Sequence, residues 1–399
     1  VARFTNGYKV FMPTEFMHAM YDQGGGAGLR DFWDRWCTNP LFAGGFIWVY
    51  CDEAPKRSDK GGILDSDKSN APDGVVGPRR EKEGSYYAIR AQWSPIQLKP
   101  LLITNHFDGR FLLTNEYTFT NLKDCRMTYK VLSCGTPLQG NAEAGKVIAE
   151  GKVQLPSINP GETGTARFEL PDSFRKGDVL ELEAFDREGK SICNWTYPIH
   201  LAKQYFERNL AQTTLTPAPQ KAEARQTSDA IELKSSKVSI TFDAATGMIR
   251  HIKSGETEVP FKDGPVAIGM KMRYEPSLSY TRHSSDGAIY CAKYKGAADS
   301  IVWRLTNEGL LYMDAILLNR GSGGGGFDDA FMDAQVFNLG LSFSYPEQNC
   351  SGMKWMGRGP YRVWKNRIPG TNYGIWHKDY NNTITGESFE NLIYPEFKG

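Results

Sequence analysis

The N-terminal part of the chain carries side chains whose types and spacing suit sugar chemistry. Glu15 and His18 lie three residues apart after a short apolar run, and Trp48 precedes Asp52 at the end of a second run. Cleavage of a glycosidic bond uses carboxylates beside an oxocarbenium-like transition state, and a flat aromatic ring can contact a sugar. The same spacing also fits a salt-bridged glutamate, a structural histidine and a core tryptophan, so the neighbouring elements must decide.

The elements expected around these side chains form one strand–helix–strand unit. Residues 9–12 predict a short strand that ends just before Glu15, and residues 45–50 are an apolar run typical of a strand buried on both faces. Between them, apolar residues recur at helical spacing before Asn39: Leu29, Phe32, Trp33 and Trp36. Barrel enzymes place their active sites at the C-terminal ends of parallel strands, so residues 1–95 are interpreted as the C-terminal part of a (β/α)8 barrel.

A last helix is expected after the polar loop of residues 53–84. Ser85 is the predicted N-cap, Pro95 the predicted end, and the residues between them place an apolar face on one side: Tyr86, Ile89 and Trp93. A parallel barrel needs eight strands, and this segment offers about two. We therefore expect about six further strands before Val1.

Residues 96–205 change to short strands separated by turns. In residues 179–185, apolar side chains alternate with two glutamates, which predicts one buried face made of Leu180, Leu182 and Ala184. Similar alternation in residues 110–119 and 165–170 predicts an antiparallel sandwich of immunoglobulin-like size.

The C-terminal half begins with a predicted linker. Residues 206–227 contain the Pro- and Ala-rich run Thr216–Lys221. Alternation then resumes, followed by a turn at residues 243–247, in a strand that contains Val238, Ile240 and Phe242. Residues 228–399 are interpreted as a second, larger β-sandwich, so the expected fold is a multidomain combination of α/β and all-β parts.

Composition argues against several other classes of function. The 47 basic and 46 acidic residues give a formal net charge of +1, without the basic footprint of a nucleic-acid-binding protein. No apolar run reaches the roughly 20 residues that a membrane helix needs. The seven cysteines and six histidines are scattered, so no metal site or cofactor site is predicted from them. Location in a bacterial periplasm or cytoplasm, and assembly into a homo-oligomer, all stay open.

Several segments, in the same order along the chain, resemble family 2 glycoside hydrolases of the β-galactosidase type. The first is Glu15, followed two residues later by His18-Ala19-Met20, which is similar to the family's nucleophile segment. Residues 31–34 resemble the helix that follows, and residues 44–48 with Asp52 resemble the last barrel strand. Residues 73–76 with 85–87 resemble the approach to the last helix, and residues 355–360 with 366–367 resemble part of the C-terminal domain.

The resemblance implies a retaining exo-β-glycosidase. Glu15 would be the nucleophile and form a covalent glycosyl-enzyme. His18 would bind sugar hydroxyls, Trp48 would form a wall of the sugar subsite, and Asp52 would lie with them in the substrate site. The acid/base glutamate, and a divalent or sodium ion with its ligands, would belong to an earlier part of a longer chain. These 399 residues alone are therefore expected to be inactive.

Two alternatives remain open at the level of sequence. The family often has Trp-Asp-Trp where this chain has Trp48-Val49-Tyr50, and Gly-Asn where it has Tyr21-Asp22. A β-glucuronidase or β-mannosidase is therefore one alternative, although the long terminal β-domain favours the β-galactosidase type. The other is a non-catalytic carbohydrate-binding or structural module, since the chain carries only one carboxylate of the expected pair.

Overall fold

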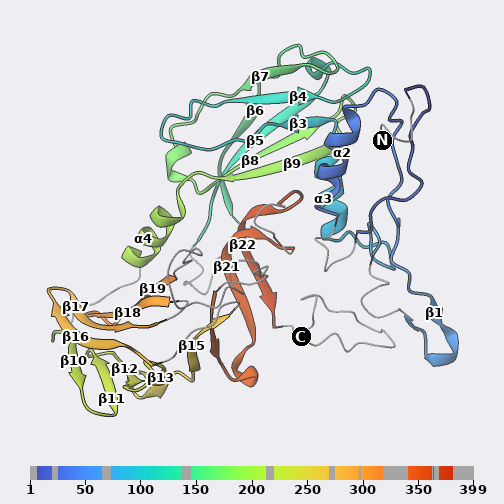
Figure 1. Cartoon of the computed structure of the whole chain (residues 1–399). Coiled ribbons are helices and arrows are strands. Elements are labelled where there is room, and N and C mark those ends of the chain that lie inside the picture. The colour runs from blue at the N-terminus through green and yellow to red at the C-terminus, as the bar shows by residue number, and fades with distance from the viewer. Residues whose placement is uncertain are drawn as a thin grey trace. The chain divides into compact units, whose positions relative to one another are not determined.

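The computed structural model describes most of the chain: residues 7–19, 26–64, 73–135, 145–212, 220–268, 275–295, 298–317, 340–361, 363 and 368–380. The chain divides into two units, one of residues 1–210 and 352–399 and the other of residues 211–351. β-strands predominate in both (Figure 1). The division differs from the four expected segments, because the residues after 351 belong with the first unit.

A β-sandwich makes up most of unit 1. One sheet is three-stranded and antiparallel, with β3 (Ile96–Leu98), β4 (Arg110–Asn115) and β7 (Thr163–Arg167). The other is four-stranded, with β6 (Lys146–Val153), β5 (Arg126–Ser133), β8 (Val179–Phe185) and β9 (Ser191–Pro198). Both sheets contribute to one core, in which Leu113, Val131 and Leu182 are fully buried. The prediction of an antiparallel sandwich here is confirmed.

Individual strands of this sandwich match the alternation in the sequence. In β8 the predicted inward residues Leu180, Leu182 and Ala184 have no exposed surface. Strand β4 ends at Asn115, earlier than predicted, and the Asn115 side chain then bonds to the chain that follows. Its amide donates to the backbone oxygens of Thr120 and Ile158, at 2.8 and 2.9 Å.

The described part of the chain contains three α-helices: α2 (Leu29–Cys37), α3 (Gly84–Gln92) and α4 (Ala202–Gln212), which begins in unit 1. Helix α2 confirms the predicted helix before Asn39. Helix α3 starts before Ser85, so the predicted N-cap is wrong, and Glu83 occupies that position. The Ser85 hydroxyl donates to the Val75 backbone oxygen at 2.9 Å, so it ties the helix to the preceding segment instead.

The two predicted barrel strands are not regular strands in the described residues. Parallel bridges join Phe11 to Phe42 and His18 to Trp48. The two segments therefore run in the same direction, as barrel strands do, but the described residues do not form a barrel. The prediction that residues 45–50 are buried on both faces is wrong. Ile47 packs against the apolar cluster under α2 and α3, whereas Phe46 and Tyr50 are 58% and 63% exposed, because no described residue covers that side.

Polar contacts fix the helices of this region to the sandwich. The Arg30 backbone amide donates to Gln92 Oε1 at 2.7 Å, and the Arg30 guanidinium donates to Glu116 Oε1 at 2.9 Å. Arg90 Nε donates to the Ile192 backbone oxygen in β9 at 2.7 Å. The segments that carry Glu15 and Trp48 pack against these two helices through Phe16, Met17 and Ile47. A small hairpin, β1 (Lys56–Arg57) with β2 (Ile63–Leu64) and a short 3₁₀ turn, projects from the same region.

Unit 2 is all-β. A five-stranded sheet contains β10 (Glu223–Gln226), β11 (Ala230–Lys234), β12 (Val238–Asp243), β13 (Ile249–Ser254) and β14 (Thr257–Glu258). A four-stranded sheet contains β16 (Leu278–Ser284), β17 (Gly287–Lys293), β18 (Ala298–Thr306) and β19 (Leu311–Leu317), and β15 (Lys262–Ile268) pairs with β20 (Gly340–Ser344). Phe242 joins the two larger sheets, with its ring centroid 4.9 Å from Tyr290 and 5.1 Å from Trp303.

The predicted linker is partly structured. Residues 206–212 belong to α4 and residues 223–226 form β10, and the residues just before these two segments, Tyr205 and Ala222, are buried. The Pro- and Ala-rich residues 216–219 at its centre lie outside the described residues.

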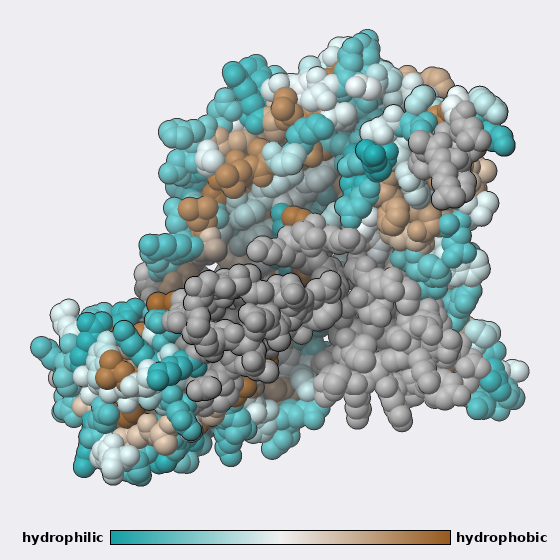
Figure 2. All heavy atoms as spheres, in the orientation of Figure 1, coloured by the Kyte–Doolittle hydropathy of each residue, from teal (hydrophilic) through white to brown (hydrophobic). Residues whose placement is uncertain are grey.

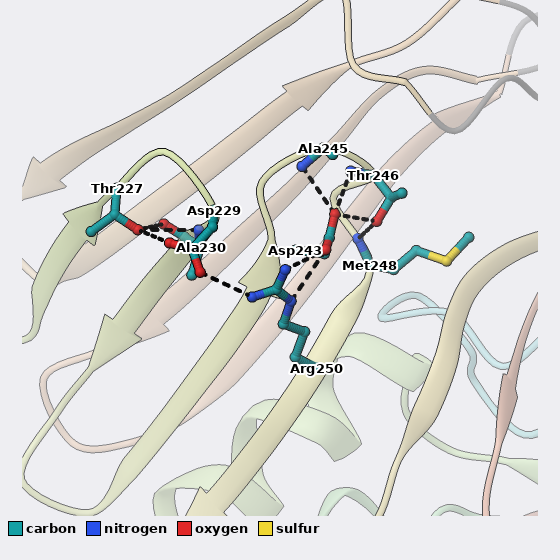
Figure 3. Close-up of polar contacts among 8 residues, drawn as sticks. All are labelled: Thr227, Asp229, Ala230, Asp243, Ala245, Thr246, Met248 and Arg250. Carbon is teal, nitrogen blue, oxygen red and sulfur yellow. Dashed lines mark hydrogen bonds and ion pairs between the residues drawn. The ribbon is translucent and has the colours of Figure 1, made fainter.

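The turn predicted at residues 243–247 is confirmed, and Figure 3 shows why it forms. The Asp243 carboxylate accepts hydrogen bonds from the Ala245 and Thr246 backbone amides at 2.9 and 2.8 Å. Arg250 Nη2 pairs with the same carboxylate at 2.6 Å, and Arg250 Nη1 lies 3.5 Å from Asp229. The Asp243 carboxylate thus closes the turn through its backbone hydrogen bonds, as aspartate does at many turns, and its ion pair with Arg250 holds β13 beside it.

The last described hairpin is β21 (Gly352–Gly359) with β22 (Asn372–Asp379). Its residue Ile375 is buried with Cys134 and Val179 of the sandwich, which is why this segment belongs to unit 1. The family-like residues 355–360 lie in and just after β21, whereas residues 366–367 fall outside the described part of the chain.

Hydrophilic residues cover much of the described surface on the face drawn in Figure 2. Figure 2 shows hydrophobic residues in small groups among hydrophilic ones on the visible face. None of the helices in the described ranges has the length and apolar character needed to span a bilayer.

Candidate active site

The site is built from three extended segments that end near one another. Residues 15–19 and 46–52 are joined by the parallel bridge between His18 and Trp48, and residues 73–77 join the second segment through the bridge between Cys51 and Val76. The Ala19 backbone amide also donates to the Asp73 backbone oxygen at 3.0 Å. Side chains 55 residues apart in sequence are thereby brought into contact.

His18 lies between two carboxylates. Its Nε2 is 3.0 Å from Glu15 Oε1, and its Nδ1 is 2.9 Å from Asp73 Oδ2. The hydrogen bond to Asp73, opposed by partial burial and assisted by Glu15, raises the pKa of His18 above its ordinary value. The site therefore favours a protonated imidazole next to Glu15.

The three members of this contact differ in their access to solvent. The side chains of Glu15 and His18 are 50% and 38% exposed, whereas that of Asp73 is 7% exposed. Glu15 is thus accessible to a ligand, and Asp73 is placed to act only through His18. The prediction that His18 binds a sugar hydroxyl meets a competing contact, because both of its ring nitrogens already face carboxylates.

Trp48 borders the same open side. Its ring centroid lies 6.2 Å from that of His18 with an interplanar angle of 38°, and the residue is 39% exposed. The Trp48 backbone amide donates to the Met17 backbone oxygen at 2.9 Å, which fixes its position along the Glu15 segment. The structure therefore brings Glu15, His18 and Trp48 together.

Asp52 is more buried than Glu15 and Trp48. It is 8% exposed, and its Oδ1 accepts a hydrogen bond from the Gly74 backbone amide at 2.8 Å. Burial, followed by the charges of Glu83, Asp73 and Glu81, raises the pKa of Asp52 to about 8. No described contact joins Asp52 to Glu15 or to His18. Its hydrogen bond instead holds the backbone at Gly74, next to Asp73.

Asp73 is the residue that the site prediction lacked. The signal available in the sequence was a carboxylate followed by Gly74 and two valines, in the segment that resembles the family's approach to the last helix. Sequence spacing does not show that this carboxylate meets His18, because that contact depends on the parallel arrangement of three separate segments.

A resident metal ion has no evident place among these residues. No group of three or more His, Cys, Asp and Glu side chains suited to a metal ion occurs in the described part of the chain. The two carboxylates nearest His18 are bridged by its ring, so we assign the described residues no metal ligand.

The chain also has relatives among known β-galactosidases. The family model for domain 4 of β-galactosidase matches residues 111–194, which lie in the sandwich of unit 1. A β-galactosidase of Actinobacillus pleuropneumoniae is 26% identical over 164 residues, covering 39% of this chain and 16% of that protein. β-Galactosidase 2 of Enterobacter cloacae is 21% identical over 425 aligned positions, covering 91% of this chain and 37% of that protein.

Among solved structures, a β-D-mannosidase from Dictyoglomus thermophilum matches 64% of this chain and 24% of its own, with 13% identity. Its TM-score of 0.21 is too low to indicate a shared overall fold. The chain spans well under half the length of the curated relatives given above. The domain match and the sequence relatives identify the chain as a relative of the β-galactosidase type of glycoside hydrolase family 2, matching a C-terminal portion of those proteins.

Proposed function

We propose that the chain is part of a retaining exo-β-glycosidase in which Glu15 is the nucleophile. The observation that carries this proposal is the contact between the accessible Glu15 carboxylate and His18, at the end of parallel segments and beside Trp48. A carboxylate so placed can attack an anomeric carbon, and a neighbouring aromatic ring can bound the sugar.

In this mechanism a Glu15 oxygen forms a bond to the anomeric carbon while the bond to the leaving oxygen breaks. The leaving oxygen takes a proton from a carboxylic acid supplied by an earlier part of the longer protein. Water then attacks the glycosyl-enzyme, with the same acid acting as base, and restores Glu15. A (β/α)8 barrel that includes residues 1–95 is the proposed framework, since it would hold both carboxylates at one strand end.

A terminal β-galactoside is the proposed substrate, because the sequence relatives named above are described as β-galactosidases. A β-glucuronide and a β-mannoside are the enzymatic alternatives, since Val49 and Tyr50 differ from the residues that the family often has there. A homo-oligomer is compatible with the proposal but is not required by it.

The test uses the protein as translated from its gene, with nitrophenyl β-galactoside, β-glucuronide, β-mannoside and β-glucoside as substrates. Glu15→Gln should lower kcat/KM on the cleaved substrate by at least about a thousandfold, because an amide cannot act as the carboxylate nucleophile. Glu53→Gln is the matched control, since Glu53 is an exposed glutamate on the neighbouring segment, and it should stay within a few-fold of the parent.

The site of covalent capture provides a second readout. A 2-deoxy-2-fluoro-glycoside of the cleaved sugar should label the peptide that contains Glu15, because such compounds trap the glycosyl-enzyme of a retaining enzyme. Label on another carboxylate would refute the assignment of Glu15. Absence of cleavage of all four glycosides, together with sugar binding, would favour a non-catalytic carbohydrate-binding module.

A further inference from the structure

The imidazole of His18 has an acidic partner at each ring nitrogen. Glu15 Oε1 lies 3.0 Å from Nε2 and Asp73 Oδ2 lies 2.9 Å from Nδ1. An ionised carboxylate only accepts hydrogen bonds, so two such partners require N–H groups on both nitrogens. That form of histidine is the imidazolium cation.

The burial of Asp73 strengthens this requirement. Asp73 is buried, and its Oδ1 has no hydrogen-bond partner in the part of the chain that the structure describes. A buried carboxylate needs compensation from a paired charge. The group placed to give it is the His18 ring, on the other carboxylate oxygen.

The neighbouring charges behind Asp73 are acidic. The charges of Glu83, Asp73 and Glu81 act on Asp52, and the pKa of Asp52 rises to about 8 through its burial and this repulsion. Asp52 is therefore mostly protonated at neutral pH, so that it adds no negative charge beside Asp73. The aromatic neighbour of His18, Trp48, carries no charge, so the ion pairs with Glu15 and Asp73 decide the state of the ring.

We propose that Asp73 is a positioning residue for the nucleophile: it orients His18 and keeps it as an imidazolium that donates from Nε2 to Glu15. The inference rests on the proposed function of Glu15 and adds a role for a residue behind it. It also changes the role of His18. The imidazolium orients the Glu15 carboxylate and stabilises its negative charge. In this arrangement its ring nitrogens do not bind sugar hydroxyls.

The first test reads the His18 ring without any substrate. In protein labelled with 15N-histidine, with His18→Gln used to assign the signal, the parent should show both ring nitrogens protonated at pH 7. Asp73→Asn should lower the pKa of His18, because the largest contribution that raises it is lost, and its protonation equilibrium should change by about tenfold. The His251 signal is the internal control, since that residue pairs with Glu258 in unit 2 and should not move.

A single protonated nitrogen on His18 in the parent at pH 7 would overturn the proposal. An unchanged titration in Asp73→Asn would also overturn it. Asparagine has the shape of aspartate and can still accept from Nδ1, so loss of charge is separated from loss of packing. If this variant does not fold, the protonation state measured in the parent still decides between the imidazolium and the neutral ring.

The second test separates this inference from the proposed function. The rate of labelling by the 2-deoxy-2-fluoro-glycoside should fall at high pH, and Asp73→Asn should move that fall to lower pH by the shift seen for His18. A titration shift without any labelling of the parent would sustain the positioning role and refute the glycosidase. Normal labelling with an identical pH profile in Asp73→Asn would sustain the glycosidase and refute the positioning role.

Discussion

At the scale of single residues, the site shows how position sets the chemistry of a carboxyl group. Glu15 is half-exposed and available for reaction, Asp73 is buried against an imidazole, and Asp52 is buried among other acids. The three groups are chemically alike in an unfolded chain. Burial and neighbouring charges give them separate roles as reactive group, positioning group and support.

The raised pKa of Asp52 predicts a specific dependence of stability on pH. Between the unfolded value near 4 and the folded value of about 8, the folded state keeps a proton that the unfolded state releases. The free energy of unfolding must therefore fall as pH rises through this window. Asp52→Asn removes the ionisable group while it preserves an oxygen that can accept from Gly74.

We expect Asp52→Asn to be more stable than the parent at pH 8, by on the order of 2 kcal/mol, and to lose this advantage near pH 4. Urea denaturation at several pH values measures the difference. Asp59→Asn is the control, because the hydrogen bond from Arg57 lowers the pKa of Asp59 and it titrates below this window. Equal pH dependence in the parent and Asp52→Asn would show that Asp52 is ionised in the folded protein.

At the scale of elements, α4 is attached to the sandwich through one buried carboxylate. Asp178, which is 1% exposed, accepts from Arg208 Nη1 and from the Cys134 backbone amide, each at 2.6 Å. The Tyr205 hydroxyl donates to the Asp178 backbone oxygen. Arg208 in α4 thus pairs with the Asp178 carboxylate, whose burial in the sandwich without a cation would be unfavourable.

We expect Arg208→Ala to destabilise unit 1 by about 2 kcal/mol, because it leaves the Asp178 carboxylate buried without its cation. Lys203→Ala is the control on the same helix, since its ion pair with Glu207 is 3.6 Å long and exposed, and it should change stability by less than about 0.5 kcal/mol. Thermal denaturation compares the two variants. Equal melting temperatures would show that the Asp178 contact does not hold the helix.

At the scale of the whole molecule, unit 1 is assembled from two stretches that are far apart in sequence. Strands β21 and β22 follow all of unit 2 along the chain, yet Ile375 is buried with Cys134 and Val179. The stacked rings of Tyr87 and Tyr361, with centroids 5.3 Å apart, connect the same C-terminal stretch to α3. The stability of unit 1 should therefore depend on residues after 351, and that of unit 2 should not.

Ile375→Ala tests this dependence. It should lower the free energy of unfolding of unit 1 by about 2 kcal/mol through lost burial, with faster hydrogen exchange in β5, β8 and β22. Exchange in β11, β12 and β17 should stay as in the parent. Ile316→Ala, at a position that is 53% exposed, is the control and should have little effect anywhere. Faster exchange throughout both units would contradict the division.

Local patterns were sufficient for the elements whose partners lie nearby in sequence. The apolar spacing in residues 29–36 predicts α2, the alternation in residues 179–185 predicts β8, and Asp243 with Gly247 predicts the turn between β12 and β13. The proximity of Glu15 and His18 follows from the same local order. Each of these features depends on the preferred geometry of a few consecutive residues, which the sequence contains in full.

Only the tertiary structure decided the features that depend on residues far apart. The sequence could not show that Asp73 would meet His18 across 55 residues, that Ser85 would bond to Val75 in place of capping α3, or that β21 and β22 would join unit 1. Burial is also a property of the assembled chain, which is why Phe46 and Tyr50 are exposed and why the pKa of Asp52 is raised. A contact or an electric field between distant segments exists only when folding has placed them together, so no local pattern encodes it.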